Sequence, residues 1–119
     1  MIYFITVNYN AYFDTMKLLE SLFLNPFQEF KIIVVDNCSC DDSVKNIINF
    51  VERYFGNTNE LYCIDCENRE EEKDFLPKVT IIKSNSNKGF GAGNNLGLKL
   101  VKKYKKSHDL IWLINNDTT

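Results

Sequence analysis

The sequence predicts an α/β protein, a three-layer α/β/α sandwich in which a mainly parallel sheet lies between two layers of helices. Four short apolar runs, at residues 2–7, 30–35, 79–82 and 110–114, indicate strands. They are continuous and rich in Ile and Val, as in parallel strands that are covered on both faces. Helical patterns separate the runs, and this alternation with right-handed crossovers produces such a sandwich.

Three helices are expected between the strands. Asn10 is a predicted cap for the first, which Asn25 and Pro26 terminate. Ser39 followed by Asp42 resembles a capping box for the second, which ends at Gly56. The third is expected to start after the glycines at 89, 91 and 93. Its predicted apolar face consists of Leu96, Leu100, Val101 and Tyr104.

The composition describes one domain spanning residues 1–119. The 45% apolar fraction supplies a core, and 2 Pro and 5 Gly do not indicate a low-complexity chain. The net charge is −2, so the chain does not have the excess of positive charge that binds phosphate backbones, and no nucleic-acid partner is expected.

Residues 57–78 are polar and are predicted to be an exposed insertion. Its acidic cluster consists of Glu67, Glu70, Glu71, Glu72 and Asp74.

The first apolar run follows no basic segment and is interrupted by Thr6 and Asn8, so neither a signal peptide nor a membrane span is expected there. A cytoplasmic location and reduced cysteines follow as expectations.

Four thiolates for zinc would come from two pairs, Cys38 with Cys40 and Cys63 with Cys66, but unliganded thiols are the favoured interpretation. Trp112 is expected in the core, and no catalytic role is expected for His108.

Polar side chains follow all four predicted strands. Ligands of open parallel sheets bind across the carboxyl ends of the strands, so these residues are candidates for a binding site. Amides suit the hydrogen bonds of a base, a ribose and a sugar, and the carboxylate of Asp117 suits Mg²⁺ or Mn²⁺ under a diphosphate. The residues at the strand ends are Asn8, Tyr9, Asn10, Asp36, Asn37, Ser84, Asn85, Asn87, Asn115, Asn116 and Asp117.

The glycine-rich segment at residues 87–95 does not match the dinucleotide fingerprint G-x-G-x-x-G. Its glycines lie at 89, 91 and 93, and it follows the third predicted strand instead of the first. A dinucleotide-dependent oxidoreductase is therefore disfavoured. The glycines indicate a tight turn where the backbone passes close to a ligand and a helix packs closely on the sheet.

Four segments in order, at residues 6–10, 34–43, 87–97 and 113–118, resemble the signature of family 2 glycosyltransferases of the GT-A fold. The rhamnosyltransferase-like branch is the most similar, and the resemblance covers the chain apart from residues 57–78. It implies metal-dependent transfer of a sugar, with inversion, from a UDP- or dTDP-linked donor. The implied acceptor is a hydroxyl of a saccharide or lipid-linked molecule in cell-surface polysaccharide biosynthesis, which would place the protein peripherally at the inner face of the membrane.

The resemblance also implies roles for individual residues. Residues 6–10 would lie along the nucleotide, Asp36 would bond the base or ribose, and Asp117 would match the last metal-binding acid of the DxD-type motif. Asn115 stands where many relatives carry the first acid, and Gly93 and Asn94 stand where other branches carry an arginine. The implied nucleotide-sugar site consists of Thr6, Val7, Asn8, Asn10, Asp36, Asn87, Gly89, Gly93, Asn94 and Asn115, with Asp117 for the metal.

The resemblance places the catalytic base beyond Thr119, together with the acceptor-binding half. The chain is therefore expected to be the donor-binding fragment of a larger or truncated transferase and to be inactive alone. The alternative is a noncatalytic module that binds nucleotide or associates into homo-oligomers through an exposed sheet edge.

Overall fold

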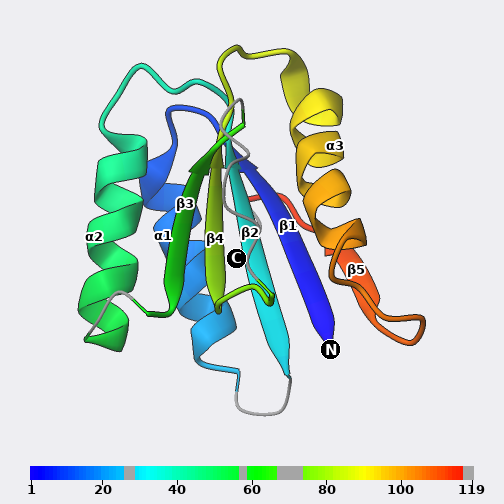
Figure 1. Cartoon of the computed structure of the whole chain (residues 1–119). Helices are drawn as coiled ribbons and strands as arrows, with labels where there is room; N and C mark the ends of the chain where they lie inside the picture. Colours follow the sequence, from blue (N-terminus) through cyan, green and yellow to red (C-terminus); the bar gives the residue numbers. More distant parts are fainter. Residues whose placement is uncertain (26–28, 57–58, 67–73, 117–119) are drawn as a thin grey trace.

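The computed structural model describes residues 1–25, 29–56, 59–66 and 74–116 and contains one all-parallel sheet (Figure 1). The strand order is β3-β4-β2-β1-β5. In chain order the elements are β1 (Ile2–Asn8), α1 (Tyr12–Phe23), β2 (Phe30–Asp36), α2 (Ser43–Phe55), β3 (Leu61–Asp65), β4 (Val79–Lys83), α3 (Gly89–Lys102) and β5 (Leu110–Leu113).

Helices cover both faces of the sheet, which confirms the predicted sandwich. Because side chains alternate between faces, Phe4 and Ile32 join the core under α1 and α2, whereas Ile5 and Val35 join the core under α3. Figure 1 shows α3 on one side of the sheet and α1 with α2 on the other. The arrangement is consistent with a GT-A-type domain.

Helix α3 begins at Gly89, so the prediction that it starts after the glycines was wrong. Gly93 and Gly97 are buried inside the helix, four residues apart on one face. A Cβ atom at Gly93 would lie 2.9 Å from Val7 Cγ2, and one at Gly97 would lie 2.6 Å from Ile5 Cγ2. The missing side chains therefore let α3 lie directly on β1.

Strand β3 corrects the prediction that residues 57–78 form an insertion without regular structure. It pairs in parallel with β4, from Leu61 opposite Val79 to Asp65 opposite Lys83. A short run with a charged residue at its end gives a weak local signal, and its pairing comes from a strand that follows it along the chain. The acidic residues at positions 67–72 lie outside the described residues.

Neither predicted side-chain cap is present. The residue that caps α1 is Ala11, while Asn10 has a positive φ of 49° and its Oδ1 accepts bonds from the backbone N–H groups of Cys40 and Asp41. The capping residue of α2 is Asp42, and the Ser39 hydroxyl bonds Asp36 instead. Both side chains therefore hold loops together at the carboxyl edge of the sheet.

Strand β5 lies at one edge of the described sheet and pairs only with β1. The prediction that Trp112 fills the core was wrong, because the residue is 56% exposed and covers Phe4 from the edge, with ring centroids 5.5 Å apart. Leu110 and Leu113 are also exposed. An uncharged apolar strand at a sheet edge is unusual, since edges commonly carry charges that discourage association.

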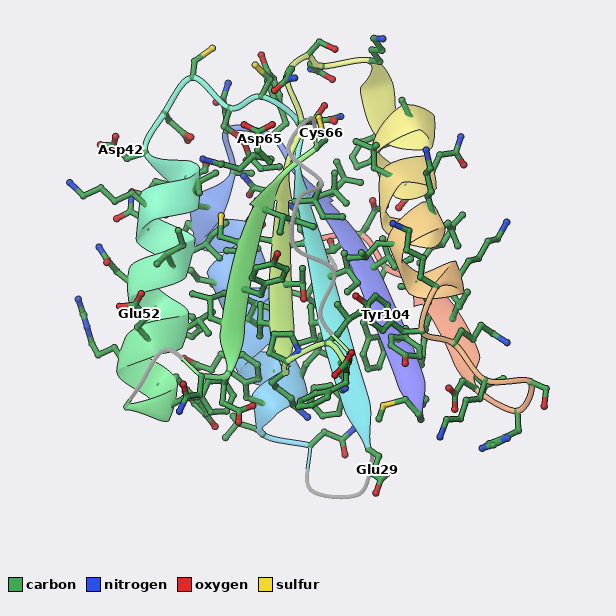
Figure 2. All side chains as sticks on the ribbon, viewed as in Figure 1. Glu29, Asp42, Glu52, Asp65, Cys66 and Tyr104 are labelled. Carbon is green, nitrogen blue, oxygen red and sulfur yellow. The ribbon has the colours of Figure 1, made fainter. Side chains whose placement is uncertain are left out.

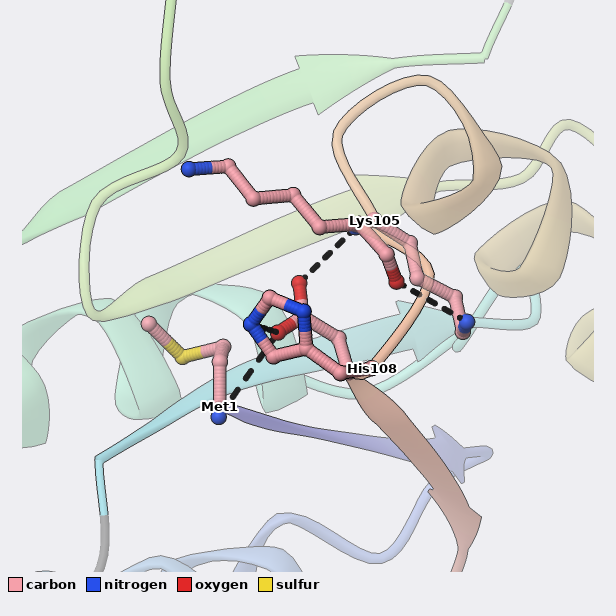
Figure 3. A network of polar contacts seen from close by, with 5 residues as sticks. Met1, Lys105 and His108 are labelled. Carbon is pink, nitrogen blue, oxygen red and sulfur yellow. Dashed lines mark hydrogen bonds and ion pairs between the residues drawn. The ribbon is translucent and has the colours of Figure 1, made fainter.

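A polar network at the amino ends of the strands fixes the start of the chain (Figure 3). The buried Asp109 lies 3.7 Å from the Met1 amine and 3.9 Å from His108 Nε2, and the backbone N–H of Lys106 donates to it. That backbone bond, with the nearby amine and imidazole, lowers the pKa of Asp109. His108 thus lies at the edge of the sheet opposite to the strand ends that the sequence singled out.

Within the described ranges, no helix combines the length and apolarity needed to cross a bilayer.

Candidate functional site

A cavity of about 280 Å³ opens at the carboxyl edge of the sheet, between the end of β1 and the start of α3. We call it the edge cavity. Its walls come from the loop after β1, the residue after β2, the first turn of α3 and the segment after β5. The lining residues are Val7, Tyr9, Ala11, Asn37, Asn87, Gly89, Phe90 and Asn116.

Asn37 is the most informative residue of the edge cavity. Its side chain is only 2% exposed, and its Nδ2 donates to the Gly89 carbonyl (3.0 Å) and to Asn87 Oδ1 (3.2 Å). Its Oδ1 is buried and accepts no hydrogen bond from any described residue. A buried acceptor without a partner is costly, so a hydrogen-bond donor on a ligand would stabilise this atom.

The family resemblance implied the base-binding role for Asp36, whereas Asn37 was a candidate only as one of the polar residues at the strand ends. Adjacent residues of a strand point to opposite faces of the sheet. Asp36 ends β2 on the face of α1 and α2, and Asn37 follows it on the face of α3, where the edge cavity lies. Strand parity, counted from the alternating core residues, would have distinguished the two.

Two exposed aromatic side chains line the edge cavity from different elements. Tyr9 lies in the loop after β1 and is 46% exposed, and Phe90 lies in the first turn of α3 and is 59% exposed. Exposed rings beside a cavity provide flat apolar surfaces on which a base or a sugar stacks. Phe90 was not among the predicted site residues, and its only signal in the sequence was a large aromatic side chain between glycines.

Asn8 and Asp36 lie together, as predicted, but both are buried and bonded within the protein. Asn8 Nδ2 donates to Asp36 Oδ1 (2.9 Å), which also accepts from the Ser39 hydroxyl (2.6 Å). Asp36 Oδ2 accepts from the Ser39 backbone N–H (3.0 Å). This carboxylate therefore joins the ends of β1 and β2 to the loop that leads into α2.

The same network continues through α1. The Thr15 hydroxyl donates to Asn8 Oδ1 (2.6 Å), and Asn116 Nδ2 donates to Thr15 Oγ1 (3.1 Å). Asn116 follows β5 and lines the edge cavity, so the buried network reaches the cavity wall at this residue.

The remaining candidates are distributed unevenly. Val7, Asn87 and Gly89 line the edge cavity, and Gly93 lies directly behind Val7. Thr6 is buried, with an Oγ1 that has no partner among the described residues. Asn10 orders the loop before α2, while Asn94 and Asn115 are not among the lining residues. The predicted metal ligand Asp117 lies outside the described residues.

A second, more open cavity of about 420 Å³ lies at the same edge, beside α2. Figure 2 shows Asp42 and Asp65 at this edge and Glu29 at the opposite one. Asp36 and Ser39 line the second cavity together with Lys83, whereas Asn37 lines the edge cavity. The polar surface at the strand ends thus extends from β5 to β3.

The cysteines do not form the tetrathiolate group that zinc would need. Among the residues described, no three His, Cys, Asp or Glu side chains converge as metal ligands. Burial raises the pKa of the Cys63 thiol, an effect that Lys83 partly opposes.

An all-parallel α/β sheet with a cavity across its carboxyl edge, bounded by the glycine-rich start of a helix, defines a nucleotide-binding type of α/β domain. The family model described as glycosyl transferase family 2 matches residues 3–119. The chain belongs to this family and is a glycosyltransferase-like domain that binds nucleotide sugars. No curated protein and no solved structure was found to match it.

Proposed function

We propose that the edge cavity binds the nucleotide part of a UDP- or dTDP-linked sugar and that the chain is the donor-binding part of an inverting glycosyltransferase. The observation that supports this most directly is the buried Oδ1 of Asn37 in the cavity wall, which accepts no hydrogen bond within the described part of the chain. Uracil and thymine carry an imide N–H that donates one hydrogen bond, and Asn37 Oδ1 accepts one. Tyr9 and Phe90 supply surfaces for stacking.

The diphosphate would lie beside the start of α3. This helix begins at Gly89 in the cavity wall, and its N-terminal N–H groups and dipole favour negative charge. Asp117 supplies a carboxylate and Asn115 an amide oxygen, both of which suit Mg²⁺ or Mn²⁺. Such a cation, when bound, would neutralise charge on the leaving diphosphate.

The rest of the reaction needs groups outside the cavity. Transfer also needs a base that deprotonates the acceptor hydroxyl, and none of the residues that line the edge cavity is an acid or a histidine. We therefore propose that the residues of the edge cavity bind the donor but do not by themselves turn it over. The activity we propose for the enzyme is rhamnosyl or hexosyl transfer to a saccharide or lipid-linked acceptor at the cytoplasmic face of the membrane.

Calorimetry with UDP, dTDP and GDP, each with and without Mn²⁺, tests the proposal. Asn37→Ala is expected to lower the affinity for the nucleotide that binds most tightly about tenfold. The substitution removes an acceptor that has no partner among the described residues and would receive a hydrogen bond from the ligand. Asn95→Ala is the matched control, since Asn95 is exposed on α3 and does not line the cavity. Asp117→Ala is expected to remove the Mn²⁺ dependence. Absence of binding by the native chain to all three nucleotides would contradict the proposal.

The open edge at β5 favours a second candidate, a noncatalytic module that associates with a second copy of this chain. Leu110, Trp112 and Leu113 are exposed on a strand without a charged residue. Two copies paired along β5, related by a two-fold axis, would continue the sheet and cover these side chains on both partners.

For this candidate, sedimentation equilibrium of the native chain is expected to show a dimer that Trp112→Lys converts to a monomer, because a lysine placed at the edge opposes pairing. Phe13→Lys, an equally exposed aromatic position on α1, is the control and is expected to stay dimeric. A native chain that remains monomeric up to about millimolar concentration, the weak end of the affinity scale, would exclude the candidate.

A further inference from the structure

The hydrogen bonds that join Asp36 to Asn116 all point in one direction. Asp36 Oδ1 accepts from Asn8 Nδ2, so Asn8 has its NH₂ group toward Asp36 and its carbonyl oxygen toward Thr15. The Thr15 hydroxyl then donates its single proton to Asn8 Oδ1. Only lone pairs of Thr15 Oγ1 remain for Asn116, which must therefore present its NH₂ group to Thr15.

This one-way order has a consequence at the edge cavity. The oxygen and nitrogen of an amide are attached to the same carbon and diverge from it, so the bond from Nδ2 of Asn116 to Thr15 turns Oδ1 away from Thr15 and leaves this oxygen available to a ligand. Without Thr15, the amide could rotate and present its nitrogen instead. The burial of Asn8 and Thr15, both fully inaccessible, excludes the water that would otherwise reverse the order.

We propose that Thr15 is a positioning residue that sets Asn116 with its carbonyl oxygen toward the edge cavity, where this oxygen accepts a hydrogen bond from a hydroxyl or N–H group of the bound nucleotide sugar. This inference rests on the proposed function, and it assigns a role to a helix residue that does not line the cavity. Asn116 Oδ1 and Asn37 Oδ1 would then be two hydrogen-bond acceptors in the cavity wall. Such a pair favours ligands that present hydrogen-bond donors.

The orientation of Asn116 can be measured without any nucleotide. In ¹H–¹⁵N spectra of the ligand-free chain, the side-chain NH₂ of Asn116 is expected to show a hydrogen-bonded proton with slow exchange. Thr15→Val, which has nearly the same shape but no hydroxyl, is expected to abolish that signature, and Thr15→Ser is expected to restore it. An unchanged Asn116 signal in Thr15→Val would overturn the positioning role.

The ligand role is tested by a double-mutant cycle on the nucleotide, among UDP, dTDP and GDP with Mn²⁺, that the native chain binds most tightly. Thr15→Val and Asn116→Ala are each expected to weaken binding about five- to tenfold, and Thr15→Ser less than twofold. Because Thr15 acts through Asn116, the double variant is expected to bind as Asn116→Ala does. Independent, additive losses would show that Thr15 acts by another route.

Other outcomes of the same experiments are also decisive. A Thr15→Val protein with a lower melting temperature and unchanged affinity would reduce Thr15 to a structural role. If Thr15→Val does not fold, Thr15→Cys, with a similar volume and only a weak donor and acceptor, takes its place in both experiments. If the native chain binds no nucleotide, the proposed function and the ligand role both fail, while the spectra still decide the orientation of Asn116.

Discussion

Replacing Asp36 by alanine is expected to lower the free energy of unfolding by about 2–5 kcal/mol. The carboxylate accepts bonds from Asn8 Nδ2, the Ser39 hydroxyl and the Ser39 backbone N–H, and it is almost fully buried. Each buried donor that loses its partner costs about 1–3 kcal/mol, and the Nδ2 group of Asn8 is fully buried and cannot turn to solvent. Urea denaturation followed by circular dichroism measures the loss.

Asp42→Ala is the control for this prediction. Asp42 is exposed at the start of α2 and makes no side-chain capping bond, so its replacement is expected to change stability by less than about 0.5 kcal/mol. The family resemblance suggested that Asp36 bonds the ligand directly. If Asp36→Ala kept the stability of the native chain and lost only nucleotide binding, the carboxylate would face the ligand and the network described above would not hold.

Gly97→Ala is expected to destabilise the protein by about 1–3 kcal/mol, although alanine is the better helix former. A Cβ atom at this position would lie 2.6 Å from Ile5 Cγ2 and 3.4 Å from Val35 Cγ2, so α3 would have to move off the sheet. Ile5 is fully buried in the centre of β1 and has no space into which it could retreat. The same denaturation experiment measures the effect.

Gly91→Ala, in the same helix, provides a control of opposite sign. A Cβ atom there meets nothing within 4 Å, so the substitution is expected to stabilise the protein by about 0.5–1 kcal/mol through helix propensity alone. Two alanine substitutions six residues apart would then change stability in opposite directions. Equal effects at both positions would contradict the close approach of α3 to β1.

The sequence predicted the edge of the sheet at which polar side chains gather, but not the contacts that each of them makes. Polar residues after parallel strands must share one edge of the sheet, and the edge cavity lies there. The family resemblance nevertheless implied a ligand-binding role for Asp36 and none for Asn37. The role of each of these two side chains depends on which face of the sheet it occupies. Thr15 lies inside a helix, and no local sequence pattern marks it as part of the network.

Local pattern alone determined the sandwich and four of the five strands, since continuous Ile- and Val-rich runs such as residues 30–35 are stable only when helices cover both of their faces. Tertiary contacts decided the rest. Strand β3 exists through its pairing with β4, Trp112 is exposed because β5 lies at an edge, and Asn10 and Ser39 join loops instead of capping helices. Such features depend on partners distant in the chain, which the local order of residues does not specify.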